Sequence, residues 1–177
     1  MGSSDRHHCV FGPGYLAVSE QPALLCTVCG AGLAVTVWDR SRRKGAMIHA
    51  VLAATPKGAA PTNFHMTVAL KNVLERVHAK DRYLFLVAQL FGAGFSEAES
   101  NDKNAALVSA AKRILVRAGV KVISEDVGGS SGRKVMFDTH TGDAMVMKTR
   151  SIRKSDWQPQ FLMDIEKNGR APKGFRS

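Results

Sequence analysis

Three apolar, β-branched segments follow one another in the first third of the chain and are joined only by short turns. The first two, residues 24–29 and 33–38, are separated by Gly30-Ala31-Gly32, and a charged turn leads from the second into residues 46–52. Short β-branched runs separated by turn residues indicate consecutive β-strands. Part of the core must therefore be a β-sheet.

An amphipathic helix is predicted to follow these strands. Its apolar side chains recur at intervals of three and four residues, which places them on one helical face. Thr62 or Asn63 is expected to cap the helix start. The stripe consists of Met66, Ala69, Leu70, Val73, Leu74 and Val77.

The second half of the chain repeats this alternation of strand and helix. Residues 83–91 form a continuous apolar run, which is typical of a buried strand. A second helix is expected to start at Ser100 or Asn101 and to end near Gly119. Its apolar stripe comprises Leu107, Ala111, Ile114, Leu115 and Ala118. Three short strands are predicted after it, at residues 120–124, 133–137 and 143–147.

These elements predict one layered α/β (α+β) domain. It combines a mostly antiparallel or mixed β-sheet structure with two main helices, and it spans residues 12–150. Residues 1–11 are expected to be a flexible N-terminus, and residues 151–177 a basic, partly disordered C-terminal extension. A chain of 177 residues is long enough for one domain with a real core.

Composition indicates a cytoplasmic protein without a cofactor. The 45% hydrophobic and 23% charged content is ordinary for a globular domain, and no apolar run reaches the length of a membrane span. Three cysteines, an odd number, do not indicate a disulfide framework. Cys26 and Cys29 form a C-x-x-C pattern, but their offset of three places them on opposite faces of a strand. We therefore expect no metal site.

The net charge of +10 is concentrated in the cluster Arg40, Arg42, Arg43 and Lys44 and in the C-terminal extension. Such charge is most often a solvated surface. It could also make the chain a basic adaptor that holds an acidic protein, a membrane surface or nucleic acid. Nucleic acid is the less favoured partner, because no aromatic residues interleave with the cluster.

An ordered set of motifs gives the chain a resemblance to a known family. The segment from Thr27 to Asp39 resembles the signature T-x-L-G-S-C-V-A-V-C-L-Y-D of CheD proteins, and Gly45-Ala46-Met47-Ile48-His49 is similar to the G-G/A-M-x-H motif of that family. Further matches extend the resemblance over about residues 12–148. They are Phe91-Gly92-Ala93-Gly94, Asn104, Glu125-Asp126-Val127-Gly128-Gly129, Arg133 with Val135, and Thr141-Gly142.

The resemblance implies a chemotaxis protein that acts on the cytoplasmic helices of chemoreceptors. CheD proteins deamidate selected receptor glutamines to glutamates, and some bind a CheC-like phosphatase. The resemblance also implies a cysteine that attacks the glutamine carbonyl, a histidine that serves as acid and base, and a threonine that orients this histidine. Position by position, His49 matches the histidine and Thr27 the threonine.

Gly32 occupies the position of the nucleophilic cysteine, and glycine has no group that can attack a carbonyl. Three hypotheses follow. The chain is a non-catalytic pseudo-deamidase that binds a receptor or a CheC-like partner, or it is a hydrolase in which Cys29 or a water attacks near His49, or it is the basic adaptor. Cys29 would require rearrangement of the glycine-rich loop, since three strand residues span about 10 Å.

Two further departures from the family pattern lie downstream of His49. Met66 stands in place of an acidic residue, and Leu52-Ala53-Ala54 replaces a typical L-P. We expect both on the substrate-facing side, where they would change receptor recognition.

Overall fold

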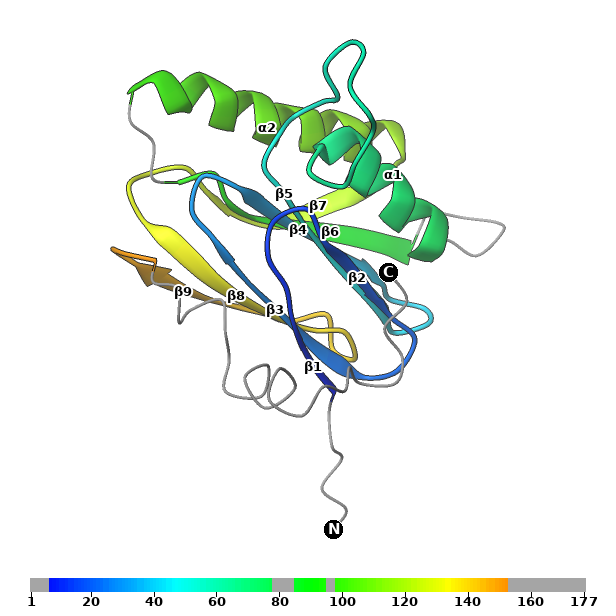
Figure 1. Cartoon of the computed structure of the whole chain (residues 1–177). Coiled ribbons are helices and arrows are strands. Elements are labelled where there is room, and N and C mark those ends of the chain that lie inside the picture. Colours follow the sequence, from blue (N-terminus) through cyan, green and yellow to red (C-terminus); the bar gives the residue numbers. More distant parts are fainter. Residues whose placement is uncertain (1–6, 78–84, 95–97, 153–177) are drawn as a thin grey trace, which may run out of the picture.

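The protein is built from three layers. The computed structural model describes residues 7–77, 85–94 and 98–152. Two helices cover one face of a five-stranded sheet, and a four-stranded sheet packs against the other face of that sheet (Figure 1). The predicted layered α+β domain with two main helices and mixed sheets is confirmed.

The five-stranded sheet lies in the middle. It contains two of the three closely spaced strands predicted first, at residues 33–38 and 46–52, whereas the strand at residues 24–29 belongs to the other sheet. Its order is β2-β5-β4-β6-β7, and only the pair β6–β7 is parallel. The strands are β2 (Leu16–Ser19), β4 (Leu33–Asp39), β5 (Lys44–Ala50), β6 (Leu86–Gly92) and β7 (Lys121–Val127). β4 pairs with β5 through the charged turn.

The four-stranded sheet has the order β1-β3-β8-β9. Its strands are β1 (His7–Val10), β3 (Ala23–Cys29), β8 (Gly132–Asp138) and β9 (Ala144–Thr149). β3 and β4 follow each other along the chain yet belong to different sheets, so the Gly30-Ala31-Gly32 turn carries the chain from one layer to the next. The residues before and after this turn therefore face each other across the space between the sheets.

The helices are α1 (Met66–Val77) and α2 (Ala98–Arg117). All six residues of the stripe predicted for α1 are buried, which confirms the period of 3.6 residues as the signal. In the part of the chain that the structure describes, neither helix is long and apolar enough to cross a membrane.

Two apolar cores hold the layers together. One lies between the helices and the central sheet and includes Val35, Leu70 and Leu115. The other lies between the two sheets and includes Cys29, Met47 and Phe137. Alternate residues of the central strands supply the two cores, because successive side chains of a strand point to opposite faces.

Three local predictions were wrong or incomplete. His65 directly precedes α1, and its carbonyl accepts from the backbone N–H groups of Val68 and Ala69, so neither Thr62 nor Asn63 is the cap. Residues 62–65 instead form a turn in which His65 N–H donates to the carbonyl of Thr62 (3.0 Å). α2 begins at Ala98, ahead of the caps predicted for it. The structure also adds the parallel strand β1, which the sequence did not predict.

Gly142, in the turn between β8 and β9, allows the cost of a steric overlap to be separated from the cost of a positive φ. Gly142 and Gly58 have nearly the same positive φ, 79° and 83°, so alanine at either position carries a similar backbone penalty of about 1–2 kcal/mol. A Cβ at Gly142 would overlap the ring of Trp38, whereas a Cβ at Gly58 meets nothing within 4 Å. We predict that Gly142→Ala lowers the free energy of unfolding by about 1–3 kcal/mol more than Gly58→Ala. Equal losses in chemical denaturation would contradict this packing.

Candidate functional site

Thr27 and His49 meet between the two sheets. Thr27 lies on β3 of the outer sheet and His49 on β5 of the central sheet, and each side chain is about 1% exposed. The hydroxyl of Thr27 lies 3.0 Å from Nδ1 of His49. The structure thus brings together two residues that the resemblance assigned to one site, although they come from different layers.

The hydrogen bonds at Thr27 determine which nitrogen of His49 carries the proton. The Thr27 hydroxyl lies 2.7 Å from the carbonyl oxygen of Phe11, which can only accept, so the single hydroxyl proton goes to that carbonyl. Only lone pairs of the hydroxyl remain for His49, and Nδ1 must therefore be the donor in their contact. In the neutral ring, Nε2 then carries the basic lone pair.

Burial keeps this ring neutral. It lowers the pKa of His49 from 6.5 to about 4, because the charged imidazolium would lose its hydration between the sheets. His49 is therefore a neutral imidazole throughout the physiological pH range.

Gly32 lies directly in front of Nε2. A Cβ at this position would overlap Nε2 and would lie 2.9 Å from Cδ2 of His49 and 3.0 Å from Cγ1 of Val51. The imidazole therefore fills the space in which a side chain at Gly32 would begin. Nδ1 of His49 therefore faces the Thr27 hydroxyl, and Nε2 faces position 32, where the resemblance implies a cysteine.

Cys29 is a core residue at the end of β3. Its side chain has no exposed surface, and burial raises the pKa of its thiol to about 12. The positive charge of Arg133, its partner in the β3–β8 register, acts in the opposite direction but does not offset the burial. The thiolate needed for attack on a carbonyl is therefore strongly disfavoured.

The loop after Cys29 is held in place by the end of β6. The N–H of Ala93 donates to the carbonyl of Gly32 (2.7 Å), and the N–H of Gly94 donates to the carbonyl of Gly30 (2.9 Å). A rearrangement that moved the Cys29 sulfur to the position in front of His49 would break these hydrogen bonds.

Cys26 and Cys29 do not form a common site. Cys29 lies in the core between the sheets, whereas Cys26 lines a hollow on the outer side of β3. This arrangement agrees with the opposite faces expected from their offset. Within residues 7–77, 85–94 and 98–152, no three His, Cys, Asp or Glu side chains are grouped so that they could hold a metal ion.

Of the exposed residues next to His49, sequence reasoning pointed to Leu52 and missed Tyr15 and Phe64. Tyr15, Leu52 and Phe64 are 64%, 45% and 44% exposed. The N–H of His49 donates to the carbonyl of Tyr15 (3.1 Å), and the N–H of Leu52 donates to that of Phe64 (2.9 Å), so all three lie at this end of the sheet. These residues are not regularly spaced along the chain, so no periodic pattern in the sequence predicted that they share a surface. We call Tyr15, Leu52 and Phe64 the rim.

One expected surface residue is buried instead. Met66 has no exposed surface and packs in the core between α1 and the central sheet, so its predicted place on the substrate-facing side is wrong. It is the first residue of the apolar stripe of α1, and that position points inward. Leu52, from the other departure, is exposed on the rim, and its place on a substrate-facing side stays a prediction.

Comparison with known proteins places the chain among chemotaxis proteins. The sequence profile of the family described as "CheD chemotactic sensory transduction" matches residues 57–148. The chain is 34% identical over 152 residues to "Probable chemoreceptor glutamine deamidase CheD 1" of Anaeromyxobacter dehalogenans (strain 2CP-C), with 82% of this chain and 86% of that protein covered.

Two further relatives carry similar names. "Probable chemoreceptor glutamine deamidase CheD 2" of Geobacter sulfurreducens is 29% identical over 149 residues, which are 80% of this chain and 89% of the relative. "Probable chemoreceptor glutamine deamidase CheD" of Burkholderia mallei (strain SAVP1) is 32% identical over 155 residues, 82% of this chain and 65% of the relative. The matched profile and these sequence similarities establish that the chain belongs to the CheD family.

Proposed function

We propose that this CheD-family protein binds the cytoplasmic helices of a chemoreceptor without deamidating them. The single observation that carries the proposal is Gly32 in front of Nε2 of His49, where the family has its cysteine. The names of the relatives support the receptor as the partner. The cytoplasm is then the compartment in which the protein acts.

The surroundings of His49 argue against a replacement nucleophile. The thiol pKa of about 12 leaves on the order of one part in 10⁵ of Cys29 as thiolate at neutral pH. A water activated by His49 would need a base with a pKa near the working pH, and the pKa of His49 is about 4. The ring also fills the position from which a nucleophile would attack.

The rim supplies a surface for binding. Apolar side chains that are exposed together indicate an interaction site more often than scattered ones do. Tyr15, Leu52 and Phe64 lie beside the strand end that carries His49, where a receptor glutamine would have to approach the family active site. An amphipathic helix that lays its apolar face on such a surface is a common mode of recognition. A CheC-like phosphatase is the alternative occupant of the same rim.

The adaptor hypothesis is weakened by the contacts of the basic cluster. Arg42 pairs with Asp39 (2.7 Å) and donates to the carbonyl of Val77 (2.8 Å). Lys44 pairs with Glu20 (3.0 Å). Half of the four cations in the cluster thus have carboxylate partners within the chain, which reduces the charge available for an acidic surface.

Deamidation of a receptor fragment, measured by mass spectrometry, tests the loss of activity. We predict no conversion by the wild type or by Cys29→Ala. Gly32→Cys restores a thiol beside Nε2, provided that the imidazole shifts to admit it, and should convert glutamine to glutamate, whereas the matched Gly32→Ser should not. Wild-type turnover that Cys29→Ala abolishes would show that the protein is a hydrolase and would refute the proposal.

Binding of the same fragment tests the rim separately from the chemistry. Truncation of a central aromatic anchor typically costs about 1–4 kcal/mol, so Phe64→Ala should weaken binding about tenfold or more. Val116→Ala is a matched control, since Val116 is 73% exposed on α2, away from the rim. Isothermal calorimetry, with thermal unfolding as the check of folding, distinguishes the two. Equal affinities of the two variants would exclude the rim as the docking surface.

The neutral state of His49 predicts a specific pH dependence of stability. Between pH 6.5 and about 4 the unfolded chain takes up a proton at His49 that the folded chain does not. The free energy of unfolding should therefore be independent of this group above pH 6.5 and fall by up to about 3 kcal/mol as the pH drops to 4. His49→Asn should remove this part of the slope, and His7→Gln, at an exposed position, should not. Parallel slopes for wild type and His49→Asn would contradict a buried neutral histidine.

A further inference from the structure

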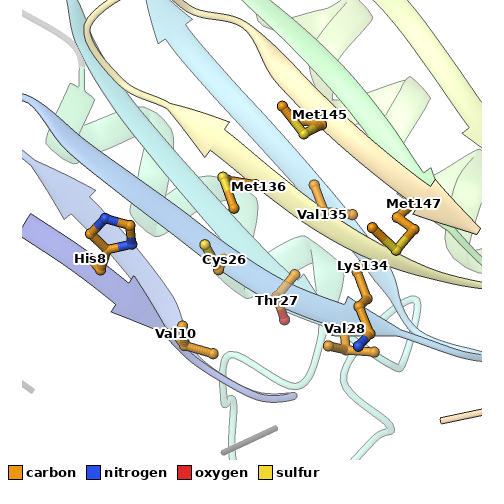
Figure 2. A pocket seen from close by; sticks show the side chains of 10 residues that line it. All are labelled: His8, Val10, Cys26, Thr27, Val28, Lys134, Val135, Met136, Met145 and Met147. Carbon is orange, nitrogen blue, oxygen red and sulfur yellow. The ribbon is translucent and has the colours of Figure 1, made fainter. Parts of the chain in front are cut away.

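The outer face of the four-stranded sheet is apolar and lies far from the helical layer. The inner face of this sheet packs against the central sheet, whereas the alternate residues of β3, β8 and β9 point outward. Figure 2 shows three methionines gathered on this outer face. Met136, Met145 and Met147 are 37%, 69% and 63% exposed. We call these three residues the methionine face.

The methionine face borders a shallow hollow of about 310 Å³. Val10, Cys26 and Val28 form its other side, so strands β1, β3, β8 and β9 all contribute (Figure 2). The polar residues of its lining are His8, Thr27 and Lys134. A soluble domain gains free energy by covering an exposed surface of this kind, and methionine suits an adaptable contact.

The chain itself continues beyond the strand that borders this hollow. The last described strand, β9, ends at Thr149 within the same sheet, and the sequence continues to residue 177. Trp157, Phe161 and Ile165 recur every four residues in this continuation, the spacing at which apolar side chains share one helical face. The continuation therefore follows a strand that lines the hollow, and its sequence supplies apolar side chains for covering it.

We propose that residues 153–177 dock on the methionine face through Trp157, Phe161 and Ile165. Attachment next to the hollow gives the segment an effective concentration in the millimolar range, which a separate partner seldom reaches.

A second copy of the chain is the competing occupant. The attached segment is favoured over this second copy, because its effective concentration at the hollow does not depend on the protein concentration. The proposal concerns a different surface from the rim, and it does not depend on whether the rim binds a receptor.

Methionine oxidation by a dilute peroxide, followed by peptide mass spectrometry, tests the proposal in the full chain. Phe161→Asp should release the segment and raise the oxidation rates of Met136, Met145 and Met147 several-fold. Gln160→Asp introduces the same charge at the neighbouring position and should leave these rates as in the wild type. Met47 and Met66, which have no exposed surface, serve as internal references for global unfolding. Equal oxidation of the methionine face in all three proteins would overturn the proposal.

Tryptophan fluorescence distinguishes the two occupants. The difference spectrum between the wild type and Trp157→Phe reports the surroundings of Trp157. Docking within the chain predicts a blue-shifted emission that is independent of protein concentration and that moves to the red in Met136→Lys. A blue shift that disappears on dilution would assign the face to a second copy and overturn the proposal, as would an emission typical of tryptophan in water.

Discussion

The hydrogen bond between Thr27 and His49 connects the two sheets at the candidate site. Strands β3 and β5 belong to different layers, yet the Thr27 hydroxyl oxygen on one lies 3.0 Å from Nδ1 of His49 on the other. It also orients the imidazole, since the hydroxyl proton is committed to the carbonyl of Phe11. The direction of Nε2 toward Gly32 follows from this one contact, and the chemistry open to the site follows from that direction.

The contact also stabilises the fold independently of any chemistry at the site. The pair is buried and its hydrogen bonds are made within the protein, so its removal would leave a buried polar group unsatisfied, which costs about 1–3 kcal/mol. Thr27 and His49 are thus retained by the stability of the fold, whether or not a thiol stands beside them. The rim, in contrast, is exposed, and no such packing demand keeps Tyr15 and Phe64 apolar.

Much of the fold could be predicted from periodicity, but the arrangement of its layers could not. The stripe of α1 and the apolar strands are local patterns, and both appear in the structure. The assignment of β3 and β4 to different sheets depends on which faces pack together, and no local pattern carries that information. For the same reason, the proximity of Thr27 and His49 followed only from family resemblance. β1 was missed because two of its four residues are exposed histidines.

Gly32 is more than a position from which a thiol is missing. Because the His49 ring fills the place of a Cβ there, any side chain at this position would have to displace the imidazole or strain its hydrogen bond to Thr27. Val51 closes the same space from another side. The His49 ring can therefore occupy this position only because residue 32 has no side chain. A buried, neutral imidazole that packs against a glycine is stable as a structural element, and a cysteine introduced at position 32 would require a movement of His49.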